Sequence, residues 1–224
     1  MLRPRKRITK RELKEDPIVK YAGIASKWIE NNLRYITIGA SCVLIALVGI
    51  FVVTTSTRQS ENDASVELAR ATRAYQDHDY TGALEMLNGI VEKYGRTRSG
   101  KLAKYYLART FYQNQDYENA QLYFEEFAKS FSGDEYIKAA ALGGIAACLE
   151  QKEEYTAAAR QYEKVVEKYP ETILASGYLI RAARCYTHAD QLEKANELYK
   201  KIIDEYPDSQ EKDEAVMLDA MLSE

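Results

Sequence analysis

The sequence predicts an all-α protein in which one membrane-spanning helix precedes an α-solenoid of helix pairs. One observation is a run of 23 residues without a charged side chain, 35–57, which as a helix is long enough to cross a bilayer. The other is a pattern of about 37 residues that occurs four times after this run, because repeats of such length are typical of stacked helical units. We therefore divide the chain into a basic arm (1–34), a transmembrane helix (35–57) and a repeat domain (64–224).

The arm is basic and contains an amphipathic stretch. Its ten Lys and Arg outnumber four Asp and Glu, which leaves a net charge of −9 on the rest of a chain whose total is −3. The apolar residues after Pro17 share one helical face: Ile18, Tyr21, Ala22, Ala25, Trp28 and Ile29. We expect a helix in the lipid headgroup region, with Trp28 and Tyr35 as interfacial anchors. Acidic residues interrupt the basic ones, so we expect no nucleic-acid partner.

The apolar run 35–57 is interpreted as an uncleaved signal anchor. A buried core helix rarely runs so long without a charge, and a cleaved signal peptide has a shorter apolar region, of about 7–15 residues. Basic residues beside a span stay in the cytoplasm, so the repeats should lie on the other side. Small residues form a strip along the span that suits close helix packing, on a second copy or another protein, although small residues are common in membrane helices anyway: Gly39, Cys42, Ala46 and Gly49.

The repeated stretch begins at Asp79, Asp116, Glu154 and Gln191, and the second helix of each unit should begin near Tyr80, Tyr117, Tyr155 and Leu192. These helix starts are 37, 38 and 37 residues apart, and three further positions recur at the same intervals. They are a small residue, a large one four positions later, and an aromatic residue at the end: Ala83, Ala120, Ala158 and Ala195; Leu87, Phe124, Tyr162 and Tyr199; Tyr94, Phe131, Tyr169 and Tyr206. The alanines should lie where helices cross closely, and the large residues should fill the space between units. No unit buries its faces alone, so the stack is the folding unit.

These residues resemble the tetratricopeptide repeat family. The positions of its signature are occupied here by Leu107, Ala108, Phe111, Ala120 and Phe124, and its closing proline by Pro170 and Pro207. The stretch 213–224 is in register with the first helix of a fifth unit and should cap the stack. The chain departs from the family pattern in its longer period, in the absence of the signature Trp, and in having Ala74 and Leu149 where the family has Tyr.

Residues that could carry chemistry are scarce. The only two histidines, His78 and His188, fall in polar turns, and no nucleotide-binding or hydrolase motif occurs. We expect no metal, no cofactor and no enzymatic activity. Cys148 and Cys185 hold equivalent positions in neighbouring helices, whose spacing of about 8–10 Å is too wide for a disulfide.

The family resemblance implies that the first helix of each pair lines a concave face that binds protein. The exposed candidates by register are Tyr75, Tyr105, Arg109, Tyr112, Ile180 and Arg184. Aromatic and Arg side chains carry much of the binding energy at interfaces. Family members that bind the carboxylate tails of cytosolic chaperones use Lys and Asn at fixed concave positions. The corresponding positions here hold Tyr105, Gly143, Ile180 and Arg109, Ala147, Arg184. That binding activity is therefore not expected.

The order of parts also resembles an ancillary subunit of the bacterial Sec translocon. That resemblance implies a single-pass inner-membrane protein with a cytoplasmic N-terminus and periplasmic repeats. Its partners would be translocon subunits, and periplasmic chaperones or exported chains. An assembly factor for another membrane or envelope complex is the alternative.

Overall fold

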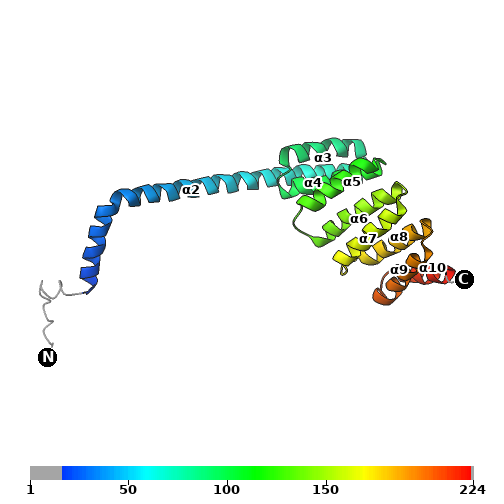
Figure 1. The fold of residues 1–224 in the computed structure, drawn as a ribbon. Coiled ribbons are helices and arrows are strands. Elements are labelled where there is room, and N and C mark those ends of the chain that lie inside the picture. Colours follow the sequence, from blue (N-terminus) through cyan, green and yellow to red (C-terminus); the bar gives the residue numbers. More distant parts are fainter. Residues whose placement is uncertain (1–16, 223–224) are drawn as a thin grey trace, which may run out of the picture. The chain divides into compact units, whose positions relative to one another are not determined.

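A computed structural model describes residues 17–222, in which every regular element is a helix (Figure 1). The chain divides into two units, Met1–Ser56 and Thr57–Glu224. The helices are α2 (Pro17–Gln76), α3 (Tyr80–Tyr94), α4 (Arg98–Gln113), α5 (Tyr117–Ser130), α6 (Glu135–Gln151), α7 (Tyr155–Lys168), α8 (Ala175–His188), α9 (Leu192–Glu205) and α10 (Lys212–Leu222). The first half of the basic arm lies outside the described residues. The prediction of an all-α fold is confirmed.

Helix α2 is continuous over 60 residues. It contains the amphipathic stretch, the apolar run and the first helix of the repeats, which the sequence suggested as separate elements. The side chains of the apolar run are exposed, for example Ile45 at 71% and Phe51 at 69%. Within the described residues, α2 is the single helix long and apolar enough to cross a membrane, and none of its most apolar stretch is buried inside the structure.

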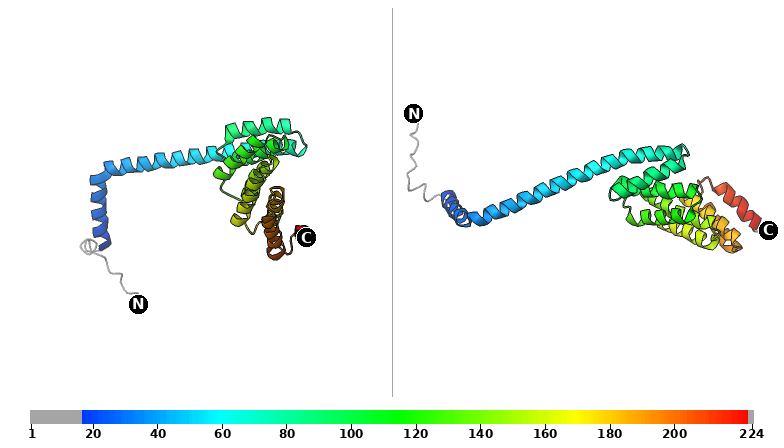
Figure 2. Two further views of the ribbon diagram at one scale, coloured as in Figure 1. Left: turned by 45° about the vertical axis from the view of Figure 1, so that its right-hand side comes forward. Right: turned by 90° about the horizontal axis from the view of Figure 1, so that it is seen from above.

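The repeat unit is a stack of helix pairs in chain order (Figure 2). Its second helices begin at Tyr80, Tyr117, Tyr155 and Leu192, where the repeat pattern placed them. Each helix from α3 to α10 packs against its neighbours along the chain, and α10 covers α9 in the place expected of the last helix.

Each pair is joined by a turn of the same geometry. His78, Gln115, Glu153 and Asp190 all have a positive φ, between 56° and 64°. In each turn the next residue donates its backbone N–H to a carbonyl five residues back, as Asp116 does to Phe111. This is the Schellman arrangement, which satisfies free carbonyls at the end of a helix. It reverses the chain within a few residues and so aligns the two helices of a pair.

The buried core includes the residues that recur in the repeat. All four repeat alanines are fully buried, and the large residues four positions later are at most 4% exposed. The buried residues form three clusters along the stack: one from α2 to α4, one from α4 to α6, and one from α6 to α10. Cys148 and Cys185 are buried free thiols within this core.

Candidate partner-binding site

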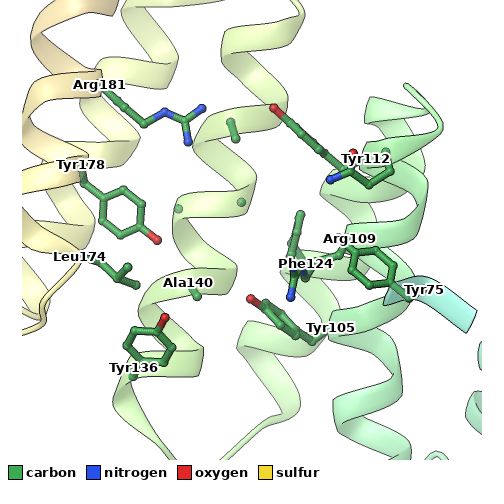
Figure 3. Close-up of a pocket in the computed structure, with 14 residues that line it drawn as sticks. Tyr75, Tyr105, Arg109, Tyr112, Phe124, Tyr136, Ala140, Leu174, Tyr178 and Arg181 are labelled. Atoms are coloured by element: carbon green, nitrogen blue, oxygen red, sulfur yellow. The ribbon is translucent and has the colours of Figure 1, made fainter. Parts of the chain in front are cut away.

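A hollow of about 370 Å³ lies between α4 and α8, over the middle of α6 (Figure 3). Its floor consists of small residues of α6: Ala140, Gly143, Gly144 and Ala147. A Cβ atom on Gly143 would lie 2.3 Å from the Tyr178 ring and hydroxyl, and one on Gly144 would lie 2.6 Å from the Phe124 ring. The two glycines therefore let large aromatic rings lie directly against the helix.

The wall from α4 carries Tyr105, Arg109 and Tyr112. The guanidinium carbon of Arg109 is 4.9 Å from the ring centre of Tyr75 and 5.7 Å from that of Tyr105. These distances are in the range of cation–π attraction, which holds the guanidinium in place. Burial raises the pKa of both Tyr105 and Tyr112, so their hydroxyls stay protonated and can donate hydrogen bonds.

The wall from α8 carries Tyr178 and Arg181, whose side chains point into the hollow (Figure 3). Arg181 donates to Glu150 Oε2 at 2.8 Å, and the Tyr162 hydroxyl donates to the same oxygen at 2.9 Å. Burial opposes the charge of Arg181, but Tyr162 and Glu150 outweigh it, so its pKa is raised. Arg181 is thus a charged group whose charge is compensated inside the protein.

Four of the six residues expected on the concave face line this hollow: Tyr75, Tyr105, Arg109 and Tyr112. The expectation that Ile180 is exposed is wrong, because its side chain belongs to the core cluster of α6 to α10 and is 5% exposed. Arg184 does not line the hollow, and it pairs with Glu214 of α10. The equivalent positions of α4, Tyr105 and Arg109, face the hollow. On α8 the core covers Ile180, and α10 supplies the partner of Arg184.

The sequence reasoning missed Tyr136, Tyr178 and Arg181 as lining residues. A signal for them was present: Gly143 and Gly144 occupy the repeat positions that hold Tyr105 and Tyr106 in the preceding unit. Two adjacent glycines inside a helix weaken it, which suggests that something packs closely there. The register alone could not show that the rings come from the next helix pair.

The candidate membrane residues all lie on α2. Trp28 is 61% and Tyr35 is 75% exposed, as interfacial anchors require. Around Gly39 and Gly49 an added Cβ would meet nothing within 4 Å, and Cys42 is exposed. The strip that also includes Ala46 is therefore free to pack on another helix, which stays a prediction.

Chemical sites are sparse over residues 17–222, which contain no group of three or more His, Cys, Asp or Glu side chains that could hold a metal ion. His78 is exposed in its turn, and the His188 ring stacks on Tyr155 with ring centres 4.9 Å apart. In the described part of the chain, the hollow between α4 and α8 is thus the feature that brings together most of the residues predicted on the concave face.

Stacked helix pairs with a hollow lined by their first helices define a class of repeat proteins that bind other proteins. The sequence profile described as "Tetratricopeptide repeat-like domain" matches residues 26–163, which is more than half of the chain, and a tetratricopeptide repeat profile matches 178–209. The chain belongs to the tetratricopeptide repeat family. A search of curated proteins finds no significant match.

Solved structures of the same fold are similar at low identity. Kinesin light chain TPR-like repeats from Podosopora anserina are 17% identical, with 72% of this chain and 86% of that chain covered and a TM-score of 0.59. A tetratricopeptide repeat protein from Parabacteroides merdae is 13% identical over 74% and 60% of the two chains, with a TM-score of 0.59. MamA from Desulfovibrio magneticus is 17% identical over 71% and 93%, with a TM-score of 0.55. These likenesses establish the fold.

Proposed function

We propose that this protein is a non-enzymatic scaffold, anchored in a membrane by the apolar part of α2, that binds other proteins through its repeats. The observation that carries the proposal is the uncharged, exposed run 35–57 in a chain that also contains a stack of family repeats. A helix that is apolar on all sides is stable when buried in a protein core or in lipid. Because the apolar side chains of this run are exposed in the structure, lipid is the environment that suits it.

The finer proposal is a single-pass protein of the bacterial inner membrane, with the N-terminus in the cytoplasm and the repeats in the periplasm. It is supported by the excess of basic residues before the span.

We further propose that the protein is an ancillary factor of the Sec translocon that links it to periplasmic chaperones or emerging chains. The order of parts supports this role, and the repeat profile begins at residue 26, ahead of the apolar run. The apolar run is thus part of the matched region.

Topology can be tested with cysteine variants and a membrane-impermeant thiol reagent in intact spheroplasts. We expect Thr81→Cys on α3 to be labelled and Lys10→Cys in the basic arm to be protected until the membrane is opened. Burial raises the pKa of Cys148 and of Cys185 to about 12, so the parent chain should give little background outside the membrane. The reverse labelling pattern would place the repeats in the cytoplasm and refute this topology.

Partners can be identified by photocrosslinking in living cells followed by mass spectrometry. Crosslinkers would be placed at Cys42 on the span, at Tyr112 in the hollow, and at exposed Met86 on α3 as a site outside the hollow. Translocon subunits from Cys42, and chaperones or exported chains from Tyr112 but not Met86, are the expected result.

The second candidate is an assembly or stability factor of another membrane or envelope complex. The small-residue strip of the span favours it equally, because such a strip can pack on any membrane helix. One unrelated complex crosslinked from both Cys42 and Tyr112 would establish this alternative and rule out the translocon role.

A further inference from the structure

The hollow between α4 and α8 differs in charge from the domain around it. The chain beyond the basic arm has a net charge of −9, yet the residues lining the hollow include Arg109 and Arg181 and no Asp or Glu. The remaining polar lining consists of tyrosine hydroxyls and Gln113. A cationic hollow on an acidic domain attracts negative groups and disfavours positive ones.

The two arginines are not equivalent. Arg181 is bonded to Glu150, and outside the hollow Arg184 is paired with Glu214. The guanidinium of Arg109, by contrast, lies against three aromatic rings, and among the described residues no side-chain hydrogen bond or ion pair reaches it. Ring faces position a guanidinium without using its N–H groups. Arg109 is therefore held in place with its donors available to a ligand.

A second hollow, of about 550 Å³, lies between α4, the end of α2 and the start of α6 and shares part of its lining with the first. Tyr105, Arg109 and Tyr136 line both. The lining of the second hollow includes apolar Leu68, Leu102 and Ile137 and one acidic residue, Asp134, whose carboxylate accepts the Tyr136 backbone N–H at 2.8 Å. Arg109 thus borders both hollows, of which the second offers aliphatic side chains and the first mainly aromatic ones.

We propose that this surface binds an extended segment of a partner protein through an internal Asp or Glu side chain, which pairs with Arg109. Planar guanidinium and carboxylate groups fit each other with two parallel hydrogen bonds. Apolar or aromatic neighbours of that acidic residue pack in the second hollow and against Tyr136 and Tyr178. An internal side chain is favoured over a chain end because Arg109 borders both hollows, so a bound chain can extend to either side of it. The inference rests on the proposed function, and it adds the chemistry of the partner.

The test starts from the full chain in lipid nanodiscs, which is panned against a peptide library displayed with both ends blocked. We expect enrichment of a single Asp or Glu with an aromatic or aliphatic neighbour. An enriched peptide is then compared with its Glu→Gln version by fluorescence anisotropy. Loss of the charge-assisted bonds should weaken binding about 10- to 100-fold.

Variants of the protein test whether the preference for an acidic residue depends on Arg109. Arg109→Gln should cause a similar loss, whereas Arg96→Gln, the same change at an exposed residue outside the hollow, should not. Tyr136→Ala, at a residue that is 48% exposed, should weaken binding but keep the preference for Glu over Gln. Circular dichroism melts check that each variant is folded.

The inference is wrong if enriched peptides lack acidic residues, if Arg109→Gln binds them as the parent does, if only peptides with a free carboxyl terminus bind, or if no peptide is enriched. None of these results decides the proposed function, which is tested separately by crosslinking from Tyr112. Absence of any protein adduct at Tyr112 would contradict the scaffold role itself.

Discussion

Single residues adopt unusual backbone conformations where the repeat requires a sharp turn. Glu153 has a φ of 62°, in the left-handed region that favours glycine, as do its equivalents in the other turns. None of the four is glycine, so each turn carries backbone strain that the neighbouring helices outweigh.

Replacing Glu153 with Gly should therefore raise the free energy of unfolding, by about 0.5–1 kcal/mol. Glu153 is exposed, so little packing is lost. The control is Ala157→Gly at an exposed position inside α7, which should lower stability by about 1 kcal/mol. Urea unfolding followed by circular dichroism measures both, and a loss of stability in Glu153→Gly would contradict the strain argument.

Glu61 on α2 predicts a pH dependence. Its carboxylate accepts hydrogen bonds from the Ser99 hydroxyl at 2.7 Å and the Ser99 backbone N–H at 3.2 Å. Burial alone would raise the pKa of Glu61, but these bonds favour the charged form and lower it. The folded state thus binds this proton less readily than the unfolded state. The contribution of Glu61 to the free energy of unfolding is present above the ordinary pKa of a glutamate and is lost as the pH falls below about 4.

We expect the stability difference between the parent and Glu61→Gln to be larger at pH 7 than at about pH 3, where the parent carboxyl is protonated. Urea titrations of both proteins across this range measure that difference. A difference that does not change with pH would show that the charge of Glu61 is irrelevant.

At the scale of the helix, the repeats differ in how they begin. Asp79 and Asp116 accept a backbone N–H with their side chains, at 2.9 and 3.1 Å, and so cap α3 and α5. Glu154 and Gln191 occupy the same place before α7 and α9 but make no such bond. Their longer side chains are poorer N-caps.

Shortening Glu154 to Asp should supply the missing cap and raise stability by about 0.5–1 kcal/mol. Asp116→Ala should lower it by about 1 kcal/mol, because the bond to Asn119 is lost. Thermal unfolding gives both values. If the two changes have the same sign, capping does not explain the difference between the units.

At the scale of the molecule, stability comes from clusters that share helices. Helix α4 contributes Leu107 to the first cluster and Ala108 to the second, and α6 links the second to the third. Because adjacent clusters use the same helix, loss of one exposes the apolar face of the next. The repeat unit should behave as one cooperative stack, as expected where neighbour interfaces dominate.

Leu107→Ala tests this coupling. Leu107 is fully buried, so the change should cost about 2–5 kcal/mol. We expect one unfolding transition, shifted as a whole, when Tyr fluorescence and circular dichroism are compared. Two separate transitions, with the α6–α10 part unaffected, would show that the stack unfolds in independent pieces.

The helix pairs and their core could be predicted from residue spacing alone, because Ala and large residues at fixed intervals are typical of stacked helical units. The beginnings of four helices, at Tyr80, Tyr117, Tyr155 and Leu192, were all readable from it. The hollow depended on tertiary structure. Its aromatic lining joins Tyr105 of α4 with Tyr178 of α8 across Gly143, and the burial of Ile180 depends on the packing of α6 to α10. Repeat register places residues on a helix, but exposure depends on the neighbouring side chains, which differ from unit to unit.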